Sequence, residues 1–225
     1  MNKALMHHCQ PKTEFGHEIG CVLALPFRHL DGDSFMDRSV YGHLCVNHGS
    51  KWQLDGRYFD GVDDYVRVPH SDSLYLDADF TVLAWISLEK IPTAYTGVID
   101  KGRDIENDFW LLGCADSNKL ICGIGFTDGT VLEQAFPEIT LGSRNLYVFG
   151  VEGSSIFMSF NGAAKTYESF TKTRNIATQQ LTFGCYNTIR LFEKIRLGKV
   201  HIHNRGLPAA ELSKHFYQKR HLFGI

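Results

Sequence analysis

The segment from Tyr58 to Ile86 constrains the fold most strongly, because it holds two alternating runs in close succession. In residues 65–69, Val66 and Val68 alternate with Tyr65, Arg67 and Pro69. In residues 80–86, one side carries Phe80, Val82, Ala84 and Ile86, and the other carries Thr81, Leu83 and Trp85. Clusters of Asp, Gly, Ser and Pro bound both runs. A two-residue period of β-branched and aromatic residues between turn-forming clusters predicts two β-strands.

The same pattern recurs along most of the chain. Further strands are expected at residues 19–27, 109–114, 120–126, 130–135, 155–160, 163–167, 180–185 and 195–203, and a turn is expected at Asp55-Gly56. Asp128-Gly129 and Asn161-Gly162 are typical of hairpin turns in which both residues have positive φ. We therefore expect an all-β fold, a two-sheet antiparallel sandwich over residues 18–225, preceded by an N-terminal arm of residues 1–17.

A short helix is expected at the C-terminal end. Pro208 suits a first helical turn, where its missing N–H costs nothing. Leu212 and Phe216 are four residues apart, a spacing that puts both on the helix face that docks on the sandwich.

The net charge argues against a nucleic-acid partner, and the hydropathy argues against a membrane-spanning segment. The net charge of −2 argues against nucleic-acid binding, which requires a basic excess. No apolar run reaches the roughly 18 residues of a membrane span. The N-terminus lacks the apolar core of a secretory signal, so a role outside a cell needs another route, such as release of a virion by lysis, or a signal that was removed.

The six cysteines match no zinc-binding spacing. We expect free, buried thiols, with a Cys114–Cys122 pair across a hairpin as the alternative. The N-terminal arm carries His7, His8, Cys9 and His17, and nothing in their spacing fixes a ligand geometry, so a loose arm is favoured over a metal site.

Several stretches together resemble the laminin-G-like jelly rolls of the concanavalin A-like lectin/glucanase superfamily. The stretches are VLALPFRHLDGDSFMDRS, FDGVDDYVRVPHSDSLYLDADFTVLAWI, TGVIDK and LYVFGVEGSSIFMSFNG. Leu146 stands where the family usually has a tryptophan. The resemblance implies that the central stretch supplies one core strand to each of two sheets.

The resemblance also implies a structural calcium ion, held between an early Asp-x-Ser loop and an acidic pair near the last strand. Asp37 and Ser39 match the early loop. Gly198 and Lys199 stand where the acidic pair is usual, which removes two carboxylates and adds a cation. The alternative is that Asp37 caps a turn through side-chain hydrogen bonds.

Some members of the superfamily hydrolyse glycans with carboxylates that alternate along a strand. A retaining pair of carboxyl groups lies about 5–5.5 Å apart. The alternating acids here are Asp104, Glu106 and Asp108, in a segment where the resemblance places a loop, so solubilising charges are favoured over catalysis. A glycoside hydrolase or lyase is the alternative function.

A binding role is favoured, with a glycan or a protein surface as the partner. Loop aromatics beside polar groups are suited to stacking on sugars, and the loop candidates are Tyr41, Tyr95, Asp104, Asp108, Tyr186 and Asn187. Trp85 is expected in the core.

The chain also resembles stand-alone modules of phage and viral particles. This likeness implies a place on the outside of a virion or cell, as a homo-oligomer or bound to capsid or tail proteins. A purely structural oligomer subunit without a ligand is the remaining alternative.

Overall fold

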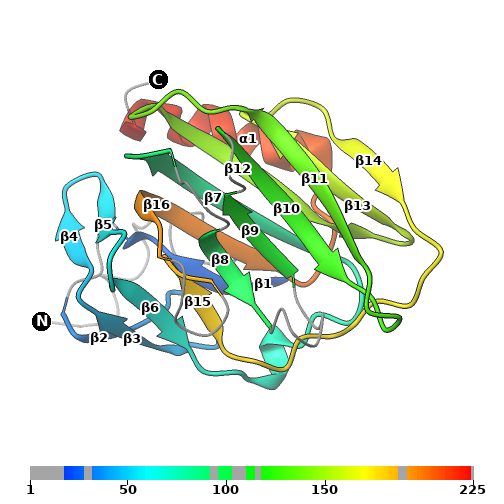
Figure 1. Ribbon diagram of the computed structural model, residues 1–225. Coiled ribbons are helices and arrows are strands. Elements are labelled where there is room, and N and C mark those ends of the chain that lie inside the picture. The colour runs from blue at the N-terminus through cyan, green and yellow to red at the C-terminus, as the bar shows by residue number, and fades with distance from the viewer. Residues whose placement is uncertain are drawn as a thin grey trace, which may run out of the picture.

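The computed structural model describes residues 18–27, 32–91, 96–102, 110–114, 118–186 and 192–223, and these form two stacked sheets (Figure 1). The strands are β1 (Cys21–Leu25), β2 (Ser34–Met36), β3 (Leu44–His48), β4 (Lys51–Gln53), β5 (Gly56–Asp60), β6 (Tyr65–Val68), β7 (Phe80–Leu88), β8 (Thr96–Lys101), β9 (Trp110–Cys114), β10 (Lys119–Gly125), β11 (Val131–Glu138), β12 (Arg144–Glu152), β13 (Ser155–Phe160), β14 (Thr166–Ser169), β15 (Leu181–Phe183) and β16 (Lys194–His203). The helical segments whose two ends both lie within the described residues include η3 (Asp72–Leu74), α1 (Ala209–Lys219) and η5 (Arg220–Phe223).

Each sheet has eight strands, and the paired strands are antiparallel. The first sheet has the order β14-β13-β12-β7-β16-β5-β4, and β1 pairs with the far part of β16. The second has the order β11-β10-β9-β8-β15-β6-β3-β2. The sequence prediction of a two-sheet antiparallel sandwich is confirmed, and β6 and β7 fall in different sheets as expected.

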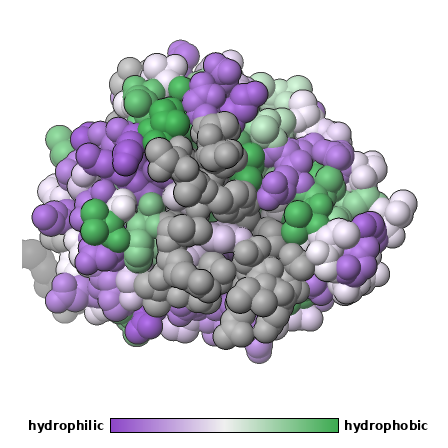
Figure 2. Space-filling model, in the orientation of Figure 1, coloured by the Kyte–Doolittle hydropathy of each residue, from purple (hydrophilic) through white to green (hydrophobic). Residues whose placement is uncertain are grey.

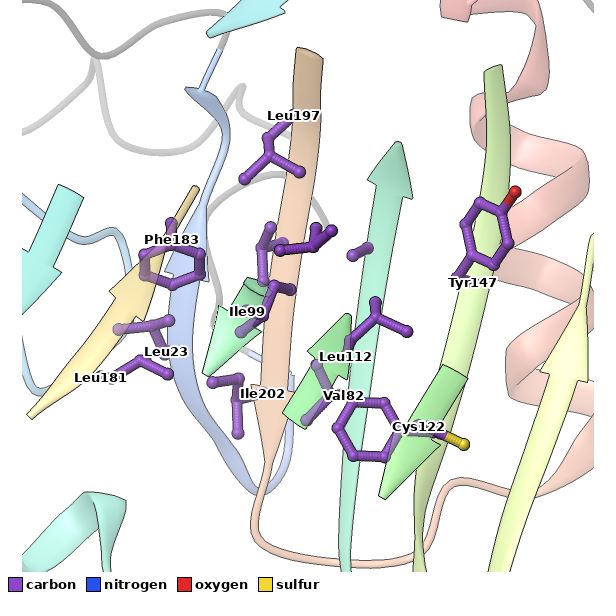
Figure 3. Packing of buried hydrophobic residues seen from close by; sticks show 14 of the residues in the cluster. Leu23, Val82, Ile99, Leu112, Cys122, Tyr147, Leu181, Phe183, Leu197 and Ile202 are labelled. Carbon is purple, nitrogen blue, oxygen red and sulfur yellow. The ribbon is translucent and has the colours of Figure 1, made fainter. Parts of the chain in front are cut away.

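The main core fills the space between the sheets. In Figure 3, side chains from β1, β7, β12 and β16 of the first sheet point toward side chains from β8, β9, β10 and β15 of the second. The first sheet contributes Leu23, Val82, Tyr147, Leu197 and Ile202, and the second contributes Ile99, Leu112, Cys122, Leu181 and Phe183. Because these residues sit at alternate positions of their strands, the two-residue period in the sequence became the inner face of the sandwich.

Strand β7 lies in the middle of the first sheet, and all nine of its residues are buried. Its inner face, with Phe80 and Val82, belongs to the main core. Its outer face carries Leu83 and Trp85, which form a second, smaller core with residues of α1. The alternation in this strand therefore separates two buried faces, not a buried face from a solvated one.

Helix α1 covers the outer face of the first sheet (Figure 1). Leu212 is fully buried there, and the ring of Phe216 stacks on Trp85 with centroids 5.8 Å apart and planes at 11°. Leu146, which lies opposite Trp85 in the β7–β12 pair, belongs to the same small core. The expected docking of the helix through Leu212 and Phe216 is confirmed, and Pro208 lies just before its first residue.

The two predicted hairpin turns differ in geometry. Asn161 and Gly162 have φ of 50° and 75°, so both are left-handed as predicted. At the other turn only Gly129 has a positive φ, of 82°, and Asp128 does not share it. Phe126 N–H donates to the Thr130 carbonyl, which makes a three-residue loop that needs one left-handed residue at its end. The prediction of two positive φ angles at Asp128-Gly129 is wrong for that reason.

Gly198 and Lys199 lie within β16, at a register shift between Leu197 and Val200. The bulge lets Leu197 and Val200 both face the main core although they are three residues apart. Beyond it the alternation is reversed, so that His201 and His203 face outward toward His215 of α1.

Among the described cysteines, Cys21, Cys45 and Cys122 are free and buried, as expected, and Cys185 is buried as well. Cys122 lies opposite Leu112, and Cys114 lies opposite Leu120, so the alternative of directly opposed Cys114 and Cys122 is not found. No helix in the described ranges combines the length and the apolar character needed to cross a bilayer.

Candidate functional site

The loop between β2 and β3 is held by the carboxylate of Asp37, which is buried. Asp37 Oδ1 accepts from the backbone N–H of Ala24 at 3.1 Å and of Ser39 at 2.6 Å. Its Oδ2 accepts from the backbone N–H of His43 and from His43 Nδ1, the latter at 2.8 Å. One side chain thus joins both ends of this loop to β1, as an Asp in an Asx-type turn does.

Ser39 adds a second set of contacts in the same loop. Its hydroxyl donates to the Val22 carbonyl at 3.2 Å and accepts from the Tyr41 N–H at 3.2 Å. The Arg38 N–H donates to the Ala24 carbonyl at 2.8 Å. The backbone that leads to Tyr41 is therefore fixed to the core strand β1.

The electrostatics of Asp37 follow from these contacts. Burial raises the pKa of Asp37, but the hydrogen bonds from His43 and Ser39 outweigh it and hold the pKa below its usual value. Both oxygens face N–H donors, whereas calcium requires oxygen lone pairs directed at the ion. The turn-capping alternative accounts for every contact of Asp37, and calcium at Asp37 and Ser39 stays a prediction.

Tyr41 projects from this loop and is 53% exposed. Its ring stacks on that of His43, with centroids 5.8 Å apart and planes at 28°. His43 is fixed on both nitrogens, because Nδ1 meets Asp37 and Nε2 lies 2.7 Å from Ser73 Oγ in η3. The loop therefore presents an exposed aromatic ring on a rigid base, beside serine hydroxyls.

Apolar side chains surround this platform. Met36 and Leu44 face each other across the β2–β3 pair and are 52% and 48% exposed, and Val40 is 71% exposed. Because β2 is the edge of its sheet, its outer backbone edge lies beside this group. Figure 2 shows that on the viewed face apolar residues gather in small separate patches among polar ones. We call Met36, Val40, Tyr41 and Leu44 the Tyr41 surface.

The other predicted contact residues do not join Tyr41 in the part of the chain that the structure describes. Tyr186 follows β15 and is only 5% exposed. Its side chain is therefore buried and does not lie on a loop surface as expected. Tyr95, Asp104, Asp108 and Asn187 lie outside the described residues, as does Glu106.

A groove of about 300 Å³ lies where the β10–β11 turn approaches the chain after β14. Its lining includes the apolar residues Phe126, Val131, Leu132 and Phe170 and the polar residues Thr130 and Lys172. Lys172 Nζ lies 2.9 Å from Asp128 Oδ2 and donates to Thr130 Oγ1 at 2.7 Å. The sequence analysis missed this groove, because its residues come from segments about 40 positions apart with no shared motif.

A tyrosine and a carboxylate meet on the outer face of the first sheet. Tyr167 Oη donates to Glu152 Oε2 at 2.8 Å, and Lys165 contacts the other oxygen of Glu152. Burial and the neighbouring Glu152 raise the pKa of Tyr167 to about 12, which makes its phenol a poor nucleophile at neutral pH. The arrangement is typical of a structural ion pair.

A histidine cluster lies under α1. Glu18 Oε2 is 3.6 Å from His201 Nδ1, 3.5 Å from His203 Nε2 and 3.4 Å from His215 Nε2. The sequence analysis weighed only the histidines of the N-terminal arm. His201 and His203 alternate on one strand, which was a usable signal, but only the fold brings His215 and Glu18 beside them.

Residues 60–213 match a family of known proteins, described as the concanavalin A-like lectin/glucanases superfamily. The comparison with curated proteins finds no match.

Solved structures of similar fold include two kinds of protein. The binding domain of botulinum neurotoxin serotype G matches with a TM-score of 0.72 and 14% identity, over 88% of this chain and 51% of that chain. The serotype D binding domain matches with a TM-score of 0.74 and 11% identity, over 89% and 52%. Trypanosoma rangeli sialidase in complex with sialic acid matches with a TM-score of 0.71 and 12% identity, over 92% and 34%. The chain spans about half the length of the neurotoxin domains and about a third of the sialidase, and the likeness shows the fold alone.

Proposed function

We propose that this chain, which belongs to the concanavalin A-like lectin/glucanases superfamily, is a non-catalytic module that binds carbohydrate through the Tyr41 surface. The observation that carries the proposal is an aromatic ring that is 53% exposed on a loop fixed by Asp37 and Ser39. A ring held in place before binding loses little conformational freedom when a sugar stacks on it. Ser71, Ser73 and the His43 ring lie near its base, where they supply polar groups.

The setting we propose is the exterior of a virion or cell, where a glycan is accessible. The neurotoxin domains are named binding domains, and the sialidase structure is named a complex with sialic acid. Fold likeness at such low identity supports the proposal only as analogy.

The test is a glycan array probed with the wild-type chain and with matched variants. Tyr41→Ala is expected to weaken binding of the best glycan at least about tenfold, which is ~1.4 kcal/mol. Tyr217→Ala removes a tyrosine of α1 that is 63% exposed, somewhat more than Tyr41, and should leave binding unchanged. Val131→Asp alters the groove without touching the Tyr41 surface, and should also leave binding unchanged.

Four outcomes would contradict the proposal. If no glycan binds, or if Tyr41→Ala binds as the wild type does, carbohydrate recognition at this surface is rejected. If Val131→Asp abolishes binding instead, the ligand sits in the groove. A protein that binds the wild type and not Tyr41→Ala would make the partner a protein surface.

The enzyme alternative is tested in the same samples. Cleavage of a bound glycan that is lost in Asp104→Asn or Asp108→Asn would support a glycoside hydrolase or lyase. Binding without cleavage supports a binding module.

A structural oligomer is favoured by one observation, the exposed apolar residues at two sheet edges. Besides the Tyr41 surface beside β2, the β4 edge of the other sheet carries Trp52 at 43% exposure, and Leu54 in the following turn is 82% exposed. Unpaired edge strands with apolar side chains pair readily with another copy or with capsid and tail proteins. A mass from light scattering above that of one chain, reduced by Leu54→Lys, would support this role.

A further inference from the structure

Four titratable side chains from three segments of the chain lie close together under α1. His201 and His203 stand on the outer face of β16, His215 comes from α1, and Glu18 precedes β1. One carboxylate oxygen, Glu18 Oε2, lies within 3.4–3.6 Å of a ring nitrogen of each histidine. The bulge at Gly198-Lys199 is what turns His201 and His203 toward this point.

The spacing fits ligands around one metal ion. Two ligands at about 2.0–2.2 Å from a tetrahedral zinc ion are roughly 3.3–3.6 Å from each other. The 3.4 and 3.5 Å distances from Glu18 Oε2 to His215 Nε2 and His203 Nε2 fall in this range. The ligand atoms of Glu18, His203 and His215 all lie within 4.8 Å of one another, as do those of Cys21, His201 and His203.

Hydrogen bonds among the described residues do not explain why Glu18 and the three histidines lie so close together. His203 is fully buried, and neither of its ring nitrogens makes a hydrogen bond of ordinary geometry, nor does Glu18 Oε2. Buried polar groups nearly always have a partner, so such a group points to one that the described residues do not supply. A small cavity of about 10 Å³ lies beside His201 and His215, which is space on the scale of one ion or one water molecule.

The histidines are also in the protonation state that metals bind. Burial lowers the pKa of His203 to about 4 and that of His215 to about 3, against the raising effect of Glu18. Both imidazoles are therefore neutral at pH 7, and each has a lone pair to donate.

We propose that Glu18, His203 and His215 bind one divalent transition-metal ion of the zinc class, with His201 as a fourth nitrogen donor beside them. Imidazole nitrogens with one carboxylate favour zinc over calcium, which prefers oxygen ligands. Such an ion ties α1 to β16 and to the segment before β1, and so closes the second core over Trp85 and Leu83.

Lys199 sets a limit on the affinity of this site. It lines the same cavity, and its charge lowers the pKa of both His203 and His215. A nearby ammonium repels a dication, so Lys199→Met is expected to tighten zinc binding.

The experiment is a thermal melt of the full chain, stripped with a chelator and then titrated with zinc, cobalt or calcium chloride. Zinc at about a hundred times its Kd is expected to raise the Tm by about 5–10 °C. Cobalt(II) is expected to give the visible absorption of a tetrahedral site at one ion per chain. Calcium is expected to leave the cobalt spectrum unchanged, because it prefers oxygen ligands.

The variants assign the site to these ligands. Glu18→Gln, His203→Gln and His215→Gln are each expected to weaken zinc binding at least about tenfold and to remove the tetrahedral cobalt spectrum. His221→Gln, which changes an exposed histidine of η5, and the His7→Gln/His8→Gln double variant are expected to keep both. His215 lies on α1 and is less buried than His203. If His203→Gln fails to fold, the His215→Gln variant still tests the metal site.

The proposal is overturned if zinc does not raise the Tm of the wild type. It is also overturned if Glu18→Gln and His215→Gln keep the wild-type cobalt spectrum, or if the His7→Gln/His8→Gln variant alone loses it. None of these readouts involves a glycan, so failure here leaves the carbohydrate proposal standing, and the reverse also holds.

Discussion

At the residue scale, Asp55 accounts for much of the polar organisation at one end of the first sheet. Its Oδ2 accepts from Arg144 at 2.5 Å and lies 3.4 Å from Arg196, whose Nε in turn lies 3.3 Å from Glu89. Burial raises the pKa of Asp55, but the hydrogen bond and charge of Arg144, with the charge of Arg196, outweigh it and hold the pKa below the usual value.

This gives a prediction about acid stability. A carboxyl whose pKa is lower in the folded state stabilises the fold above the unfolded pKa of about 3.9, and the stabilisation is lost as pH falls through the folded pKa. Asp55→Asn is expected to lower the Tm at pH 7 and to make no difference in strong acid. Because the side chain is 35% exposed, solvent screening limits the effect to about 1 kcal/mol or less.

Thermal melts from pH 7 down to pH 2 check it, with Asp63→Asn as the matched control in an exposed turn. The control is expected to stay within about 0.5 kcal/mol of the wild type at every pH. An Asp55→Asn deficit that is the same at pH 2 and pH 7 would contradict the ionic explanation.

Residue chemistry predicted part of the candidate site. An Asp at the start of a Ser- and Gly-containing loop predicts a capped turn, and Asp37 forms one, with Tyr41 exposed above it. The same reasoning failed for Tyr186, because exposure depends on what packs over a loop and not on the loop's own residues.

At the element scale, α1 owes its place to two side chains four residues apart. Leu212 is buried in the second core, and Phe216 is half-buried with its ring stacked on Trp85. Offset ring stacking adds about 0.5–1.5 kcal/mol to the area buried.

Phe216→Ala is therefore expected to destabilise the fold by about 2–3 kcal/mol and to change Trp85 fluorescence. Urea unfolding followed by tryptophan fluorescence measures both. Tyr217→Ala, at the neighbouring position that is 63% exposed, should change stability by less than about 0.5 kcal/mol. Equal losses in the two variants would mean that α1 is not held by this stack.

The bulge in β16 shows that the sequence of a strand does not by itself determine which face of the sheet each residue occupies. A strict two-residue period from Leu197 would place residues 199, 201 and 203 on the core face together with it. The extra residue at Gly198-Lys199 reverses the phase, so Val200 and Ile202 face the core instead. No local signal in the sequence marks this step strongly enough to assign the two histidines to the outer face.

At the scale of the whole molecule, the two sheets are interleaved along the chain. The last strand, β16, pairs with β1, β5 and β7, and β15 lies between β6 and β8. Neither half of the chain contains a complete sheet, so contacts of high sequence separation hold the structure together.

We therefore predict one cooperative unfolding transition for the described domain. The calorimetric enthalpy is expected to equal the van't Hoff enthalpy, and fluorescence and circular dichroism should give the same midpoint. Two resolved transitions, or midpoints that differ between the probes, would show that the sandwich divides into parts that unfold separately.

The sequence by itself determined most of the strands, the two-layer architecture, the docking face of α1 and the family. It did so because alternation with period two and the turn residues act locally, within a few positions. The tertiary structure decided which strands are buried on both faces, toward which face β16 directs its histidines, and which residues far apart in the sequence come into contact. Those outcomes depend on packing between segments such as Glu18 and His215, almost the full chain apart, and no local pattern encodes that proximity.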